Sequence, residues 1–357
     1  MIDTTGPGGA ETVFLQLARS SMENGYQAIA VIRGPGWVKS QLEEMEIPFY
    51  VIDCKGSFNI SFLRQLLKVI ASHNIDMIQT HLFGSAVYGC LAGLISRIPV
   101  FSTLHGEVDI SPDERFKILK LLILRLGATK LITITDRVNQ MLNSLPILSK
   151  RNILTIYNGI DETAYVKTTS DLKEKFNIGS APLIGSVGNI RPAKNYPLAL
   201  DVLKTLHDRG TKAHYFIAGQ GSKQQMEPLE KLIKEYNLGD YVHILGFVDD
   251  VQSFLSALDI FIMTSSSEGH PLALTQAMIN GLPIVSTPSG VEEIAVNNEE
   301  ALISDSHQAT ALADKVQLIL DNPEIAEKIS TQAKNKALCH FSLNSMTSKY
   351  LSLYHGN

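Results

Sequence analysis

The stretch Ser267–Met278 brings together groups that can hold a phosphorylated sugar. Apolar, strand-forming residues 260–263 precede it, and a helix-forming run follows Pro271. Proline suits the first turn of a helix, where its missing N–H has no helical partner. We therefore predict a strand, a short polar loop and a helix start. That geometry directs backbone N–H groups, the positive end of the helix dipole and the Glu268 carboxylate at one spot.

A second segment, 185–195, supplies cations. Its sequence GSVGNIRPAKN ends a strand in small residues and then places Arg191 and Lys194 three residues apart. Charge builds up on a departing diphosphate, and such cations stabilise it. Isolated surface cations are common, but their position at the carboxyl end of a strand favours a functional role.

Two further motifs lie in the first half. Gly6–Glu11 precedes a helical run at 13–21, and glycines there let a phosphate approach a helix start. The motif is not G-x-G-x-x-G, and the next strand ends in Arg33 instead of the acid that binds a nicotinamide cofactor's ribose. A tight turn between a strand and a helix explains the glycines of Gly6–Glu11 as well as a phosphate site does. His105 follows another strand, where a ligand contact and a structural role both remain open.

Composition limits the function classes. A chain of 357 residues suggests two domains, and 45% hydrophobic with 19% charged residues is typical of a globular protein. The net charge of −5 argues against a general nucleic-acid binder. The three cysteines form no C-x-x-C pair, which favours a reducing compartment. We expect a cytoplasmic protein, because neither a signal peptide nor a membrane-length apolar run is visible.

Strand-like and helix-like runs alternate, which predicts two doubly wound α/β domains with parallel sheets. The predicted strands are 27–33, 48–53, 77–81, 100–105, 131–135 and 153–157, then 183–187, 214–218, 242–245, 260–264 and 283–286. The second-half helices are predicted at 197–209, 224–236, 251–258 and 272–279.

The predicted domains are 1–160, completed by 341–357, and 161–340. The last helix, 343–354, has no strand after it and needs another surface for its apolar side chains. At the other end, Met1–Asp3 leads straight into a glycine loop where such a domain normally has a full strand. We expect that this strand starts upstream of Met1.

Together these motifs resemble the group-1 (family 4) retaining glycosyltransferases of the GT-B fold. The resemblance covers essentially the whole chain, and the order and spacing of the motifs carry it. The motifs are Gly8–Glu11, His105–Gly106, Asn158–Asp161, Gly188–Lys194, Ala218–Gly221, Glu268–Pro283 and Phe341–Ser342.

The resemblance implies two Rossmann-like domains facing a cleft, with the last helix crossing back to the first domain. It implies a nucleoside diphosphate sugar as donor in the second domain, an acceptor in the first, and neither a metal nor a cofactor. A D-x-D metal clamp is indeed missing from the sequence.

The implied roles follow position by position. Glu268 contacts the sugar hydroxyls, Lys194 holds the diphosphate, and His105 lies near the anomeric carbon. The backbone amides of Gly8 and Gly9 help to hold the diphosphate. The loop that frames the sugar and phosphates comprises Gly269, His270, Pro271 and Leu272.

Two positions depart from the family pattern. Gln276 replaces a glutamate that binds the nucleotide ribose, and a neutral amide makes weaker hydrogen bonds. Asn189 holds the place of the family arginine, and Arg191 lies two residues further on. Both changes lie on the donor side.

The predicted function is transfer of a sugar to a hydroxyl acceptor, with retention, in cell-surface polysaccharide or glycolipid biosynthesis. The alternatives are a same-fold nucleotide-sugar epimerase or phosphorylase, and a degenerate homologue that binds sugar nucleotides without catalysis. Residues 115–130 form a basic amphipathic segment, which allows peripheral contact with the inner face of the cytoplasmic membrane. The favoured interpretation is a helix packed on the sheet with its lysines in water.

Overall fold

The computed structural model describes residues 1–54, 56, 58–106, 110, 113–148, 153–165, 168 and 170–356. The chain divides into two compact units. The N-terminal unit comprises Met1–Gly159 and Leu343–Asn357, and the C-terminal unit comprises Ile160–Ser342.

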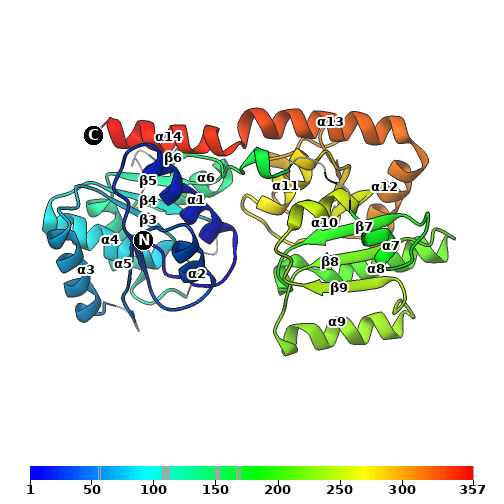
Figure 1. The fold of residues 1–357 in the computed structure, drawn as a ribbon, viewed down its shortest axis with the longest axis horizontal. Coiled ribbons are helices and arrows are strands. Elements are labelled where there is room, and N and C mark those ends of the chain that lie inside the picture. Colours follow the sequence, from blue (N-terminus) through cyan, green and yellow to red (C-terminus); the bar gives the residue numbers. More distant parts are fainter. Residues whose placement is uncertain are drawn as a thin grey trace. The chain divides into compact units, whose positions relative to one another are not determined.

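The N-terminal unit is built from short parallel strands covered by helices (Figure 1). Its elements are α1 (Gly9–Glu23), β1 (Ala30–Ile32), α2 (Trp37–Glu44), β2 (Phe49–Val51), α3 (Ile60–Ser72), β3 (Ile78–His81), α4 (Phe83–Ser96), β4 (Val100–Leu104), α5 (Lys117–Gly127), β5 (Lys130–Thr133), α6 (Asp136–Ser144), β6 (Ile153–Thr155) and α14 (Leu343–His355). The strands form two sheets, with orders β1-β2 and β3-β4-β5-β6.

Met1 and Ile2 connect these two sheets. The Ile2 amide donates to the Val31 carbonyl at 3.1 Å, and the His81 amide donates to the Met1 carbonyl at 2.9 Å. A cavity of about 490 Å³ extends from Met1 between the segments 25–31 and 73–79. The two residues therefore lie between β1 and β3, where a doubly wound sheet has a strand.

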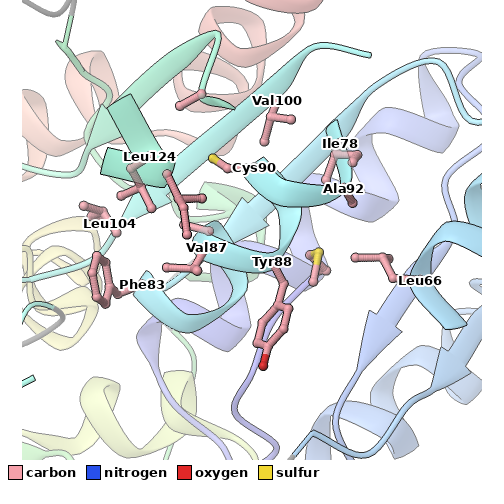
Figure 2. Close-up of a cluster of buried hydrophobic side chains, with 14 of the residues drawn as sticks. Leu66, Ile78, Phe83, Val87, Tyr88, Cys90, Ala92, Val100, Leu104 and Leu124 are labelled. Atoms are coloured by element: carbon pink, nitrogen blue, oxygen red, sulfur yellow. The ribbon is translucent and has the colours of Figure 1, made fainter. Parts of the chain in front are cut away.

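Helix α4 packs closely on β3 and β4 because two of its residues lack a side chain. A Cβ at Gly89 would overlap the Thr80 methyl group, and one at Gly93 would overlap a Val100 methyl group. Figure 2 shows a cluster of buried hydrophobic side chains of the N-terminal unit, which gather around helix α4. The close approach positions the loops that follow β3 and β4.

The final helix, α14, packs in the N-terminal unit, as the sequence predicts. Met346 and Tyr350 are buried. The Tyr350 hydroxyl lies 3.0 Å from Thr103 Oγ1 on β4, and the Tyr354 hydroxyl donates to Gln79 Oε1 on β3 at 3.0 Å. The end of the chain thus completes the first domain.

The C-terminal unit contains one parallel sheet with the order β12-β11-β10-β7-β8-β9. Its elements are η2 (Glu162–Tyr165), α7 (Leu172–Lys175), β7 (Leu183–Val187), η3 (Pro192–Lys194), α8 (Tyr196–Asp208), β8 (His214–Ala218), α9 (Lys223–Glu235), β9 (Val242–Gly246), α10 (Val251–Ala257), β10 (Ile260–Met263), α11 (Leu272–Asn280), β11 (Ile284–Ser286), η4 (Val291–Glu293), β12 (Leu302–Ile303), α12 (Ala309–Asp321) and α13 (Pro323–His340).

The connections from β7 run outward in both directions, to β8 on one side and eventually to β10 on the other. The boundary between β7 and β10 is therefore the switch point of the sheet. Ligands of open α/β sheets bind outside the carboxyl ends of the strands at such a point. No helix in the described part of the chain is long and apolar enough to span a bilayer.

Candidate active site

Lys194 and Glu268 meet at this switch point. Lys194 ends η3, which follows β7, and Glu268 lies in the loop that follows β10. Lys194 Nζ is 2.7 Å from Glu268 Oε1. The two side chains retain 25% and 13% of their exposure, so a ligand can still reach them. Partial burial strengthens their attraction for each other and for any charged group that enters.

Glycines allow the loop after β7 to reach Lys194. Gly188 has φ of +147°, which L side chains rarely adopt, and a Cβ there would come within 3.0 Å of Lys194 Cε. A Cβ at Gly219, after β8, would overlap the Gly188 carbonyl oxygen. The buried Tyr196 hydroxyl donates to that same oxygen at 2.6 Å. The loop therefore has a defined path, which positions the lysine.

Glu268 is held from both sides. Ser265 Oγ donates to Glu268 Oε1 at 2.5 Å, and the Glu268 amide donates to the Ser289 carbonyl at 2.7 Å. Thr264 Oγ1 donates to the Lys194 and Asn195 carbonyls at 3.2 and 3.0 Å. The end of β10 thus fixes both members of the ion pair. The pair offers a cation for phosphate oxygens and a carboxylate that accepts hydrogen bonds from hydroxyls.

In the loop after Glu268 the His270 ring points into the protein, so only the backbone of this loop is available to a ligand. That ring is buried, with Nε2 2.9 Å from Thr275 Oγ1 and its plane edge-on to Phe341. Burial lowers the pKa of His270 to about 3, so the ring is neutral. Pro271 is the N-cap of α11, one residue before the position predicted for it. Framing by this loop is compatible with its backbone, with N–H groups supplied by Gly269, His270 and Leu272, because Pro271 has none.

Arg191 and Lys194 lie at the two ends of a single turn. The Lys194 amide donates to the Arg191 carbonyl at 3.0 Å, and the Arg191 side chain is exposed. Gln276 lies on α11, one turn after Leu272, and is half-buried. Arg191 therefore caps the short helix that ends in Lys194, and Gln276 lies on the helix that follows the Glu268 loop.

The remaining predicted residues belong to the N-terminal unit. Gly8 is the N-cap of α1 and Gly9 is its first residue. A Cβ at Gly8 would lie 2.5 Å from Glu11 Oε2, so a carboxylate of the helix itself already lies over this N-terminus. This carboxylate reduces the attraction of the glycine loop for an anion.

His105 follows β4 and pairs with a second histidine. Its Nε2 lies 2.9 Å from His81 Nδ1, and the two rings stack with centroids 5.2 Å apart. Burial lowers the pKa of His105 to about 3, and the pKa of His81 is also lowered, by burial and by the neighbouring His105. Both rings are neutral at physiological pH.

Two family models match the chain. "Glycosyltransferase Family 4" matches residues 7–164, and "Glycosyl transferases group 1" matches residues 168–336. The chain belongs to the group-1, family 4 glycosyltransferases.

Two relatives match this glycosyltransferase over nearly their whole length. It is 24% identical to N-acetyl-alpha-D-glucosaminyl L-malate synthase of Bacillus anthracis, over 98% of the chain and 94% of that protein. It is 22% identical to an Escherichia coli enzyme, UDP-Gal:alpha-D-GlcNAc-diphosphoundecaprenol alpha-1,3-galactosyltransferase, over 97% and 93%. The crystal structure of Anabaena HepE in complex with UDP matches with a TM-score of 0.88 at 20% identity, covering 100% and 99% of the two chains. The predicted GT-B fold is confirmed.

The structure of the glycosyltransferase brings together part of the predicted site. Lys194, Glu268, Arg191, Gln276 and the loop 269–272 gather in the C-terminal unit, whereas Gly8, Gly9 and His105 belong to the N-terminal unit. Sequence reasoning missed Ser265 and Tyr196, which support Glu268 and Gly188. A serine after an apolar strand and a tyrosine after an asparagine are too common to signal such roles.

The buried histidines make the stability of the glycosyltransferase sensitive to acid. His270 is neutral in the fold but takes up a proton at its ordinary pKa of 6.5 once unfolded. Its contribution is complete above pH 6.5 and is lost as the pH falls toward 3. We expect the free energy of unfolding to fall by about 1.4 kcal/mol per pH unit for such a histidine. Denaturant unfolding between pH 7 and 4 measures this slope. His270→Asn should reduce this dependence of the free energy of unfolding on pH. The control is His307→Asn, at an exposed position, which should leave it unchanged. If His270→Asn showed the same slope as the wild type, His270 would not be the source of the acid sensitivity.

Proposed function

We propose that this glycosyltransferase moves a sugar from a nucleoside diphosphate sugar to a hydroxyl acceptor, with retention at the anomeric carbon. The observation that carries the proposal is the Lys194–Glu268 pair at the switch point of the C-terminal sheet. Crystal structures of Anabaena HepE contain UDP and UDP-glucose, which supports a nucleotide sugar as donor.

In this proposal the main catalytic contribution is charge stabilisation. The Lys194 ammonium neutralises the diphosphate as it departs, and the backbone amides of Gly269, His270 and Leu272 add hydrogen bonds. Glu268 accepts hydrogen bonds from the sugar hydroxyls and so orients the ring. A leaving phosphate oxygen takes the acceptor proton on the same face of the sugar, which retains the configuration. Arg191 adds a second cation, and the reaction requires neither a metal ion nor a cofactor.

The acceptor side is assigned to the N-terminal unit. His105 at the end of β4 would lie near the anomeric carbon as a neutral hydrogen-bonding group, and Gly8 and Gly9 would offer amides to the diphosphate. The Escherichia coli relative acts on a diphosphoundecaprenol-linked sugar, and a Staphylococcus aureus relative acts on poly(ribitol-phosphate). We therefore propose a saccharide or lipid-linked acceptor in cell-surface polysaccharide or glycolipid biosynthesis, used on the cytoplasmic side.

A donor panel tests the function. The protein is incubated with UDP-, GDP- and ADP-sugars and lipid-linked acceptors, with and without EDTA, and the product anomer is assigned by NMR. Transfer with retention, unchanged by EDTA, is the expected result. Epimerisation of a donor without transfer would favour the epimerase alternative. Tight donor binding without transfer or hydrolysis would favour a non-catalytic homologue, and an inverted product would overturn the proposed mechanism.

Gln276 provides a test of donor binding. An ionised acceptor makes hydrogen bonds stronger than a neutral amide does, by about 1 kcal/mol each. We therefore expect Gln276→Glu to lower the Kd of the preferred nucleoside diphosphate about fivefold, the equivalent of that energy. Calorimetric titration measures this Kd. The control is Gln224→Glu, at an exposed position of α9. Weaker binding by Gln276→Glu would place Gln276 away from the ribose hydroxyls.

A further inference from the structure

Helix α5 carries apolar side chains on its solvent-facing side. Ile118 and Leu126 are 68% and 70% exposed, and Leu119 and Leu122 are exposed as well. These residues lie on one face of the helix, because residues three and four positions apart point to the same side. Single exposed leucines are normal on a protein surface, whereas a contiguous set indicates an interaction site.

The opposite side of α5 is fully used by the fold. Leu121, Ile123 and Leu124 are buried, and Figure 2 shows Leu124 within the core around α4. Gly127 approaches α4 so closely that a Cβ there would lie 2.7 Å from the Cys90 Cβ. Helix α5 therefore packs against helix α4 of the N-terminal unit. The solvent-exposed side of α5, however, consists mainly of leucine and isoleucine and not of lysine.

The neighbouring helix extends this exposed surface. Leu94 follows Cys90 by one turn on α4, and both Leu94 and Ile95 are exposed. Because Cys90 contacts Gly127, these side chains lie on the helix that adjoins the end of α5. We call the combined set the apolar face; it comprises Leu94, Ile95, Ile118, Leu119, Leu122 and Leu126.

Basic side chains flank the apolar face along α5. Residues 115–130 contain five basic side chains and no acidic one, although the whole chain has a net charge of −5. Lys120 is paired with Glu114, and the Arg125 guanidinium donates to the Ile147 carbonyl while its residue stays exposed. Exposed leucines and isoleucines flanked by cations are typical of helices that lie in the interface of an anionic membrane.

We propose that the apolar face docks on the surface of an anionic phospholipid bilayer. The leucines and isoleucines enter the boundary between headgroups and acyl chains, and the flanking lysines and arginines attract the lipid phosphates. At 11 residues α5 is far too short to cross a bilayer, so the contact is peripheral. This inference goes beyond the transfer reaction and does not rest on it.

Vesicle sedimentation of the full chain tests the proposal. Vesicles of phosphatidylcholine alone are compared with vesicles that also contain phosphatidylglycerol, at low and at high salt. We expect binding to the anionic vesicles at low salt, reduced by salt and weak on the neutral vesicles. The combined variant Ile118→Ser, Leu122→Ser, Leu126→Ser should bind at least about tenfold more weakly.

The controls separate the membrane from other partners. Ile60→Ser removes an equally exposed isoleucine from α3 and should bind as the wild type does. The triple serine variant should keep its melting temperature and its turnover with a water-soluble acceptor, so failure of the proposed transfer function would not affect this result. Undiminished vesicle binding by the triple variant would overturn the proposal. So would absence of vesicle binding together with self-association that the triple variant abolishes, because the apolar face would then contact a second copy.

Discussion

Lys194→Ala is expected to lower kcat by about 10²–10³, the usual cost of removing one group that stabilises developing charge. The ammonium lies at the switch point and is held 2.7 Å from Glu268 by a loop whose path two glycines define. In the proposed reaction it faces the diphosphate as negative charge builds up. Its contribution is therefore larger in the transition state than in the ground state, and kcat should fall more than KM rises.

The matched control is Lys204→Ala, which removes a lysine from α8 in the same unit. Lys204 forms an exposed pair with Asp208, and such surface pairs contribute little to stability. Lys194→Arg keeps the charge and should recover part of the rate. Steady-state kinetics with the preferred donor, together with melting temperatures, measure all three variants. If Lys194→Ala turned over at the wild-type rate, Lys194 would have no part in the mechanism.

The C-terminal unit could be predicted well from sequence because its strands are buried on both faces. Such strands read as short continuous apolar runs, and β7 and β8 have the predicted bounds. Motifs that follow neighbouring parallel strands meet at one edge of the sheet. This rule is why Lys194 and Glu268 could be expected to approach each other, although 73 residues separate them in the sequence.

The missed features depend on three-dimensional contacts that have no local pattern. The two-residue strand β12 is defined only by its pairing with β11. The His81–His105 pair joins the ends of two strands, and nothing near either residue indicates the other. Helix α5 shows that the exposure of side chains is also hard to predict from sequence. Its sequence reveals an amphipathic basic helix, but leucines occur all around it, so only the packing on α4 shows which of them remain exposed.

Glu268→Ala is expected to separate binding of the sugar from binding of the diphosphate. The carboxylate accepts hydrogen bonds from Ser265 and Lys194, and in the proposed complex it accepts others from the sugar hydroxyls. Hydrogen bonds to a charged group contribute about 1.5–3 kcal/mol, so the transfer rate should fall about 10- to 100-fold. Affinity for the nucleoside diphosphate alone should not fall, because Lys194 loses its competing anion and becomes free to contact phosphate.

Two further variants determine whether Glu268 acts on the sugar or only through Lys194. Glu230→Ala, at an exposed position of α9, serves as the control for loss of a carboxylate. If Glu268 served only to position Lys194, the double variant Lys194→Ala, Glu268→Ala would be no slower than Lys194→Ala, since the two changes would remove one function. If it contacts the sugar, the double variant should be slower than either single variant. Parallel loss of nucleoside diphosphate affinity and rate in Glu268→Ala would contradict the sugar contact, because it would show that the carboxylate supports the phosphate site as a whole.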